Sequence, residues 1–179
     1  KLEYVRLLNE IVNKRLGGDY SEKIILNSVE FAEIRRLTEA LDWQGLAAIM
    51  CKAAQQIEAA GADCLMIGAN TMHNIADEVQ AAINIPVIHI AEVVANAIKK
   101  IGLKKVALLG TKYTMQLDFY KDKLAKQGIA VIIPGEEDIA FINNSIYNEF
   151  GKGIFSSATK QQYLDIINSI VEDGAEVMI

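Results

Sequence analysis

Short apolar segments alternate with segments of helical spacing along almost the whole chain. The apolar segments that we expect to form strands are 23–29, 64–67, 86–90, 105–109, 129–133 and 176–179. The segments that we expect to form helices are 2–16, 33–60 with an interruption near Asp42-Trp43, 71–83, 91–100, 111–126, 137–150 and 157–173. Such alternation is typical of βαβ crossovers. It predicts the α/β fold class, a sandwich of parallel sheet with helices on both faces.

Two stretches of the chain read almost alike. Gly61-Ala62-Asp63-Cys64-Leu65-Met66-Ile67 is echoed by Gly174-Ala175-Glu176-Val177-Met178-Ile179. The echo fits two pseudo-symmetric lobes, and it equally fits a helix-to-strand joint that is common in α/β proteins. On the first reading we expect a first lobe at 1–95 that lacks its first strand and a second lobe at 96–179 that is incomplete. A segment after Ile179 would then complete the first lobe.

Composition excludes several classes of function. The chain has 179 residues, 51% of them hydrophobic, and a net charge of −5, so it can build a core but offers no basic surface for nucleic acid. No apolar run reaches the length of a membrane span. We therefore expect a soluble cytoplasmic protein that binds neither nucleic acid nor membrane.

The sequence contains no pattern typical of a metal or nucleotide site. Cys51 and Cys64 belong to no C-x-x-C motif or Cys/His cluster, and we expect two buried, reduced thiols. The acidic run at 136–138 suits a helix start better than a metal site. Neither a dinucleotide fingerprint nor a P-loop is present, so no metal and no nucleotide cofactor are expected.

Two small polar turns follow expected strands. Gly68-Ala69-Asn70-Thr71 comes after the strand at 64–67, and Gly110-Thr111-Lys112-Tyr113-Thr114 after the strand at 105–109. A turn between a parallel strand and a helix presents unpaired N–H groups, which can bind a carboxylate together with hydroxyl and amide side chains. Ordinary helix capping explains Asn70, Thr71, Thr111 and Thr114 equally well.

Other polar residues carry weaker signals. His73 and His89 lie near the two turns, but buried histidines in α/β proteins are more often hydrogen-bonded core residues than catalytic ones. Arg35, Arg36 and Lys152 could reach a carboxylate substrate, although charged residues flanking helices are usually solvated.

The segments Gly68-Ala69-Asn70-Thr71-Met72-His73, 86–90 and 106–115 together resemble the aspartate/glutamate racemase family, most closely its broad-specificity L-aspartate/L-glutamate racemase branch. The resemblance implies a two-lobed, commonly homodimeric enzyme without pyridoxal phosphate or another cofactor. In that family a thiol from each lobe faces the α-carbon of a small dicarboxylate amino acid. The resemblance places Asn70, Thr71, Thr111 and Thr114 near the substrate carboxylate or among the residues that support its binding. It places Arg35 and Lys152 near the side-chain carboxylate.

The chain departs from the family pattern at Ala69. This position, where the first acid/base residue is expected, carries a cysteine or threonine in the family, and alanine cannot move a proton. The second cysteine is expected beyond Ile179. Three functions stay open: an acidic amino-acid racemase, a decarboxylase or isomerase that uses a single thiol, and a non-catalytic carboxylate-binding protein.

Overall fold

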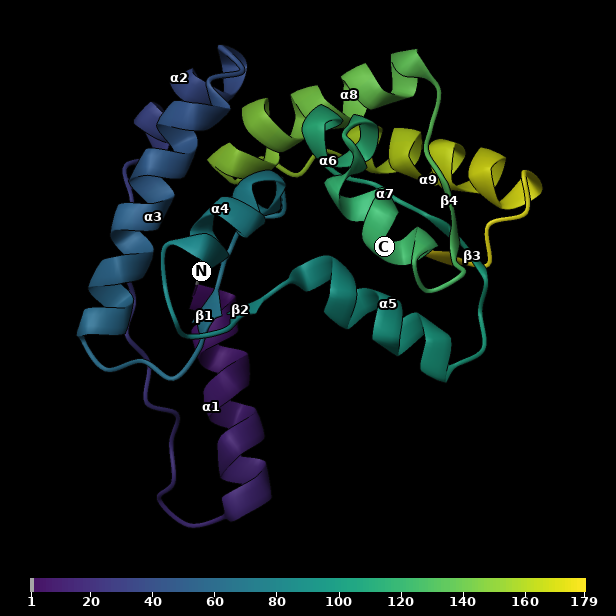
Figure 1. The fold of residues 1–179 in the computed structure, drawn as a ribbon. Helices are drawn as coiled ribbons and strands as arrows, with labels where there is room; N and C mark the ends of the chain where they lie inside the picture. The colour runs from purple at the N-terminus through teal and green to yellow at the C-terminus, as the bar shows by residue number, and fades with distance from the viewer. Residues whose placement is uncertain (1) are drawn as a thin grey trace. The chain divides into compact units, whose positions relative to one another are not determined.

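The protein is described here by a computed structural model in which residues 2–179 are placed (Figure 1). It divides into two compact units. The first comprises the chain up to Ala69 together with Ile75–Ile88, and the second comprises Asn70–Asn74 together with His89–Ile179. The chain therefore passes from one unit to the other after Ala69, after Asn74 and after Ile88.

Over its described residues, the first unit combines four helices and a pair of short parallel strands. Its elements are α1 (Leu2–Leu16), α2 (Phe31–Glu39), α3 (Trp43–Ala59), β1 (Leu65–Met66), α4 (Ala76–Ala81) and β2 (Val87–Ile88). Leu65 pairs with Val87 in parallel register. The core packs Ala54 of α3 against Leu65, Val79 and Ile83. The interruption expected near Asp42 is confirmed, because the Asp42 carboxylate accepts a hydrogen bond from the Gly45 N–H at 2.8 Å and starts α3.

The prediction of a strand at 23–29 is wrong. The structure shows an irregular segment there, and Ile24, Ile25 and Leu26 are 37%, 43% and 55% exposed. An apolar run becomes a strand only when a neighbouring strand accepts its backbone hydrogen bonds. Within the described chain, no strand pairs with this segment.

The second unit is built on a three-stranded parallel sheet. The short 3₁₀ helix η1 (Thr71–Ile75) begins in this unit, and it is followed by α5 (Ile90–Lys100), β3 (Lys105–Ala107), α6 (Lys112–Gln116), α7 (Asp118–Ala125), β4 (Ala130–Ile132), α8 (Glu136–Asn148), the 3₁₀ helix η2 (Phe150–Lys152), α9 (Ser157–Glu172) and β5 (Val177–Met178). The strand order is β4-β3-β5, with Val106 paired to Val131 on one side and to Val177 on the other.

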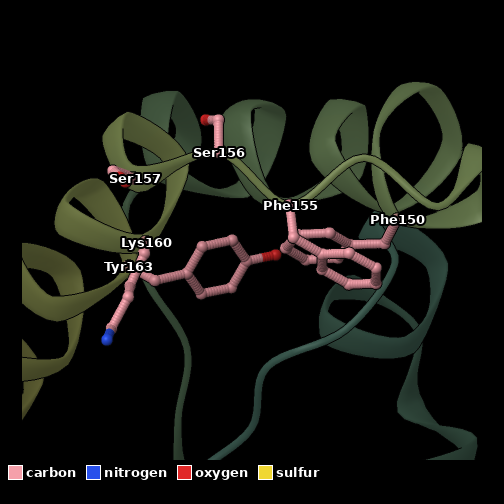
Figure 2. Close-up of a pocket in the computed structure, with 6 residues that line it drawn as sticks. All are labelled: Phe150, Phe155, Ser156, Ser157, Lys160 and Tyr163. Carbon is pink, nitrogen blue, oxygen red and sulfur yellow. The ribbon is translucent and has the colours of Figure 1, made fainter.

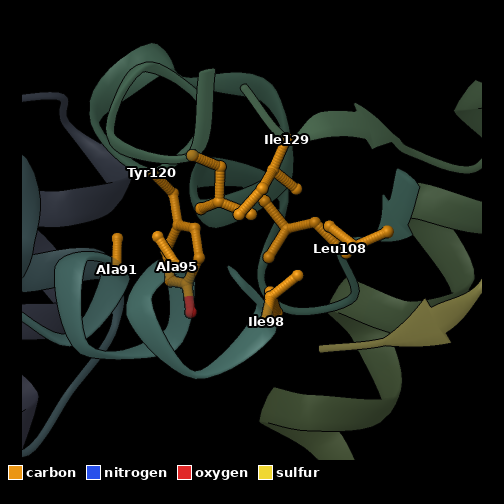
Figure 3. Packing of buried hydrophobic residues seen from close by; sticks show 8 residues of the cluster. Ala91, Ala95, Ile98, Leu108, Tyr120 and Ile129 are labelled. Atoms are coloured by element: carbon orange, nitrogen blue, oxygen red, sulfur yellow. The ribbon is translucent and has the colours of Figure 1, made fainter. Parts of the chain in front are cut away.

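Side chains of β3, and of Leu108 directly after it, alternate between two cores, one on each face of this sheet. Val106 and Leu108 pack with residues of α5 and α7, such as Ala95 and Tyr120 (Figure 3). Ala107 points to the opposite face, where it packs with residues of α6, α8 and α9. The predicted α/β class, with helices on both faces of a parallel sheet, is confirmed.

The two similar sequence segments, 61–67 and 174–179, form the same helix-to-strand turn, one in each unit. Gly61 follows α3 and Gly174 follows α9, and both adopt a φ of 90°, a conformation that favours glycine. In each case the glycine N–H donates to a carbonyl three residues earlier at 2.9 Å, Glu58 for Gly61 and Val171 for Gly174. The echo therefore marks the turn from a helix into β1 and into β5.

Two predicted helices are each broken in two. The segment 111–126 forms α6 and α7, which are separated by Leu117 in an extended conformation with φ −76° and ψ 159°. The segment 71–83 forms η1 and then α4, with the change at Ile75, where the chain also passes between units. For the segment 71–83 the two halves pack in different units, and this packing overrides the continuous helical spacing. Within residues 2–179, no helix combines the length and hydrophobicity that crossing a membrane requires.

Candidate functional site

Three threonine hydroxyls from the two predicted turns lie together in the second unit. The Thr71 and Thr111 hydroxyl oxygens are 2.8 Å apart, and those of Thr111 and Thr114 are 3.2 Å apart. Thr71 is 8% exposed, Thr114 is fully buried, and Thr111 is half-buried between them. Thr111 is therefore the central member of a connected chain of hydroxyls.

The turn after β3 holds Thr111 and Thr114 in this arrangement. Thr111 is the N-cap residue of α6, and its hydroxyl accepts a hydrogen bond from the Thr114 N–H at 3.3 Å. Gly110 allows the turn to close tightly, since a β-carbon at this position would lie 3.2 Å from both Cβ and Cγ2 of Thr114. The absence of a side chain at Gly110 thus makes room for Thr114.

The carboxyl end of β5 lies beside this turn. The Ile179 N–H donates to the Ala107 carbonyl at 2.8 Å, and the Leu109 N–H donates to the Ile179 carbonyl at 2.9 Å. Because β3 and β5 are parallel, both strands end at the same edge of the sheet. Ile179 is therefore a backbone neighbour of the segment leading into Gly110 and Thr111.

Two buried histidines flank the start of α5. His73 and His89 are 2% and 7% exposed, and their ring centroids are 4.7 Å apart in an edge-to-face contact. The Ile90 N–H donates to Nε2 of His73, and the Ala91 N–H donates to Nδ1 of His89, each at 3.2 Å. Both imidazoles therefore serve as acceptors for the first turn of α5. The prediction of hydrogen-bonded core histidines holds for both.

Comparison with known proteins decides the family. The sequence profile of the Asp/Glu/hydantoin racemase family matches residues 2–179. The chain belongs to this family. It is 36% identical over 81 residues to the broad specificity amino-acid racemase RacX of Bacillus subtilis (strain 168), an alignment that spans 44% of this chain and only 34% of RacX.

Solved structures agree with this assignment. A crystal structure of a protein assigned as an Asp/Glu racemase from Yersinia pestis superposes with a TM-score of 0.91 at 40% identity, covering 99% of this chain and 77% of that one. An aspartate racemase homologue from Pyrococcus horikoshii OT3 superposes with a TM-score of 0.79 at 33% identity, with the same coverage of both chains. The solved structures therefore support both the membership of the Asp/Glu/hydantoin racemase family and the α/β fold.

Two further predicted site residues of this racemase-family chain lie at the first turn. Asn70 has an exposed side chain, and its carbonyl accepts a hydrogen bond from the His73 N–H at 3.0 Å. Ala69 precedes it, is exposed, and offers only a methyl group. The turn therefore contributes an amide and a hydroxyl, from Asn70 and Thr71, and its Ala69 side chain can neither donate nor accept a proton.

Of the two basic residues predicted to bind the side-chain carboxylate, one belongs to each unit. Arg35 lies on α2 in the first unit, where its Nε is 2.8 Å from Oε1 of Glu39. Lys152 lies at the end of η2 in the second unit and is exposed. Among the described residues, no hydrogen bond or ion pair connects the Lys152 side chain with the threonine hydroxyls.

A separate cavity lies beside the start of α9, and the sequence reasoning did not single it out. It measures about 360 Å³ and is lined by Phe150, Phe155, Ser156, Ser157, Lys160 and Tyr163 (Figure 2). The Phe150 and Phe155 rings stack with centroids 5.5 Å apart, and the Tyr163 hydroxyl contacts the Ser145 hydroxyl at 2.8 Å. Burial raises the pKa of Tyr163, and the Glu149 charge adds to this increase, while the Ser145 hydrogen bond opposes it.

Cys51 is a poor candidate for a reactive thiolate. The Cys51 thiol contacts the Glu78 carbonyl at 3.5 Å, and burial followed by the Glu78 charge raises the pKa of this thiol. Cys64 is exposed and Cys51 is half-buried, which corrects the expectation of two buried thiols. Cys64 lies just before β1 and outside the packed core that contains Leu65. Within residues 2–179, no group of three or more His, Cys, Asp or Glu side chains could hold a metal ion.

Proposed function

We propose that this protein racemises an acidic amino acid, aspartate or glutamate, by thiol-based transfer of the α-proton without a cofactor. The observation that supports this most directly is the contact between Thr71 and Thr111, which brings the two predicted carboxylate-binding turns together at 2.8 Å. Family membership supports the reaction class. The homodimer, the cytoplasmic location and the lobe boundary near residue 95 remain predictions.

Hydroxyl groups suit the electrostatic demand of this reaction. Removing the α-proton places negative charge on the substrate carboxylate, and without pyridoxal phosphate the protein itself must stabilise that charge. A threonine hydroxyl has one proton to donate. In a chain of three hydroxyls the two contacts within the chain use two protons, which leaves one proton that these contacts do not use. The chain can therefore donate to a carboxylate while its own hydrogen bonds remain intact.

The acid and base groups are the second requirement. In the family pattern, position 69 supplies one of them, and Ala69 supplies none. The other is the cysteine that we expect after Ile179. Because Ile179 pairs with Leu109 and Ala107, a residue following it would emerge at the edge of the sheet that carries Thr111. One thiol at this edge, assisted by water or a neighbouring group on the opposite face, is the arrangement that we propose.

Ala69 also favours one alternative function. A decarboxylase of malonate-like acids needs only a single proton donor, because carbon dioxide leaves from one face and the proton is delivered to the carbanion once. The single-thiol arrangement would be sufficient for that reaction.

Solvent exchange separates these functions. Purified protein is incubated in D₂O with L-aspartate or L-glutamate, and loss of the α-proton signal is followed by NMR. Exchange accompanied by formation of the D-enantiomer supports racemisation. Carbon dioxide release from an arylmalonate, without exchange, would support the decarboxylase instead. Binding of either amino acid with neither reaction would identify a carboxylate-binding protein and contradict the racemase proposal.

A further inference from the structure

His73 attaches the first turn of the candidate site to the start of α5. It belongs to η1, two residues after Thr71, and its side chain is 2% exposed. Its Nε2 accepts a hydrogen bond from the Ile90 N–H at 3.2 Å. Ile90 is the first residue of α5, where backbone N–H groups have no acceptor within the helix. The His73 imidazole thus provides an acceptor that the helix itself lacks.

This attachment reaches Thr71 through a short stretch of backbone. The His73 N–H donates to the Asn70 carbonyl at 3.0 Å, and this hydrogen bond closes the turn that contains Thr71. The Thr71 hydroxyl then contacts that of Thr111 at 2.8 Å. Because a single turn of 3₁₀ helix has few internal hydrogen bonds, its position depends on the side chains that anchor it.

His89 supports the same junction from the side of α5. It is the N-cap residue of that helix, and its Nδ1 accepts a hydrogen bond from the Ala91 N–H at 3.2 Å. Its ring contacts the His73 ring edge to face. The two imidazoles therefore accept from successive N–H groups of α5, but only His73 belongs to the turn that carries Thr71.

We propose that His73 is a positioning residue for the substrate carboxylate, which it serves by holding Thr71 at hydrogen-bonding distance from Thr111. This inference rests on the proposed function, because it assigns the threonine cluster to carboxylate binding. His73 acts through Thr71 and does not itself touch the substrate. If the acceptor at His73 is lost, η1 is released from α5 and the hydroxyl chain loses its first member.

Four variants distinguish this role from simple core packing. His73→Phe keeps an aromatic ring but leaves the Ile90 N–H without its acceptor. Ile90→Pro removes the N–H donor and leaves His73 in place, and proline is well tolerated at the first position of a helix. His73→Gln retains an acceptor with a reach similar to Nε2. His89→Asn is the matched control, since asparagine is a favourable N-cap residue and can accept from the Ala91 N–H.

The first measurement needs no substrate. Methyl NMR of the ligand-free full chain reports the surroundings of Thr71 and Thr111. We expect His73→Phe and Ile90→Pro to shift both threonine methyl signals, whereas His73→Gln and His89→Asn leave them close to wild type. An unshifted Thr71 methyl in a folded His73→Phe or Ile90→Pro protein would overturn the positioning role, whatever the activity of the enzyme.

A double-mutant cycle then tests whether the effect passes through Thr71. We expect His73→Phe to raise the KM for L-aspartate about tenfold, in line with loss of a hydrogen bond to a charged group. In a Thr71→Val background, His73→Phe should cause no further increase. Additive effects would contradict the inference. Shifted threonine methyls in a protein whose wild type neither binds nor exchanges L-aspartate would sink the proposed function alone.

Discussion

The hydroxyls of Thr71 and Thr111 are in contact at 2.8 Å although 40 residues separate them in the chain. Thr71 follows β1 and Thr111 follows β3, so each lies in the turn after a parallel strand. Thr111 also contacts the Thr114 hydroxyl and accepts from the Thr114 N–H. It is therefore the residue whose loss should disturb the cluster most.

Thr111→Val tests this central position. Valine has nearly the same shape as threonine but leaves the Thr71 and Thr114 hydroxyls without their shared partner and removes the N-cap of α6. We expect a loss of about 1 to 3 kcal/mol in the free energy of unfolding, measured by urea denaturation, together with weaker binding of L-aspartate by calorimetry. Thr111→Ser, which retains the hydroxyl, should stay close to wild type in both measurements. Equal behaviour of the two variants would show that the hydroxyl has no role.

Much of the fold could be predicted from the sequence, because local patterns and tertiary packing agree in most elements. The segment 2–16 coincides with α1, and the caps at Asp42 and Ser156 start α3 and α9. The predicted strand at 23–29 fails because a strand also needs a partner, which the apolar pattern cannot reveal. The break between α6 and α7 at Leu117 could not be predicted either, because the helical spacing of apolar residues continues across it.

The site was predictable in part. Small and hydroxyl residues after two apolar strands pointed to Thr71, Thr111 and Thr114, and the structure brings these three together. The role of His73 could not be predicted in the same way, because its partner is the backbone N–H of Ile90. A backbone donor has no signature in the sequence, so only the fold identifies such a contact.

Gly110→Ala should displace Thr114. The added β-carbon would lie 3.2 Å from two carbons of Thr114, a fully buried side chain that has little room to move. We expect the crowding to destabilise the protein by about 1 to 3 kcal/mol, measured as a lower urea midpoint. Gly68→Ala, in the turn after β1, is the control because no atom lies within 4 Å of its added β-carbon. A larger loss in Gly68→Ala than in Gly110→Ala would contradict this account.

Glu176 should give the protein a specific dependence on acid. Its carboxylate accepts hydrogen bonds from the Lys104 and Lys105 N–H groups at 2.6 and 2.7 Å, and these hold the pKa of Glu176 below its ordinary value of 4.5. Because the folded-state pKa is the lower one, the stabilisation is fully present above the unfolded-state pKa and is lost as the pH falls through the folded-state pKa.

The measurement compares wild type with Glu176→Gln in urea. We expect the variant to be less stable at neutral pH, and the difference to shrink as the pH falls below about 4.5. Glu172→Gln removes the same charge at the end of α9 and serves as the control. A difference between wild type and Glu176→Gln that is constant from neutral pH down to acid would rule out the hydrogen-bonded carboxylate as its cause.

Ala69→Cys should increase racemisation in both directions. The position lies directly before Asn70 and Thr71 and is exposed, so a thiol can be added there without displacing core side chains. A second acid/base group on the opposite face of the α-carbon would replace water in proton transfer, and a positioned group of this kind contributes about 10²-fold or more.

Ala69→Ser adds an atom of similar size, but its hydroxyl ionises far less readily than a thiol and should leave the rate near wild type. Circular dichroism, followed separately from L- and D-aspartate, measures both directions. A folded Ala69→Cys protein with unchanged rates would mean that residue 69 does not face the α-carbon, and the racemase mechanism proposed here would be wrong.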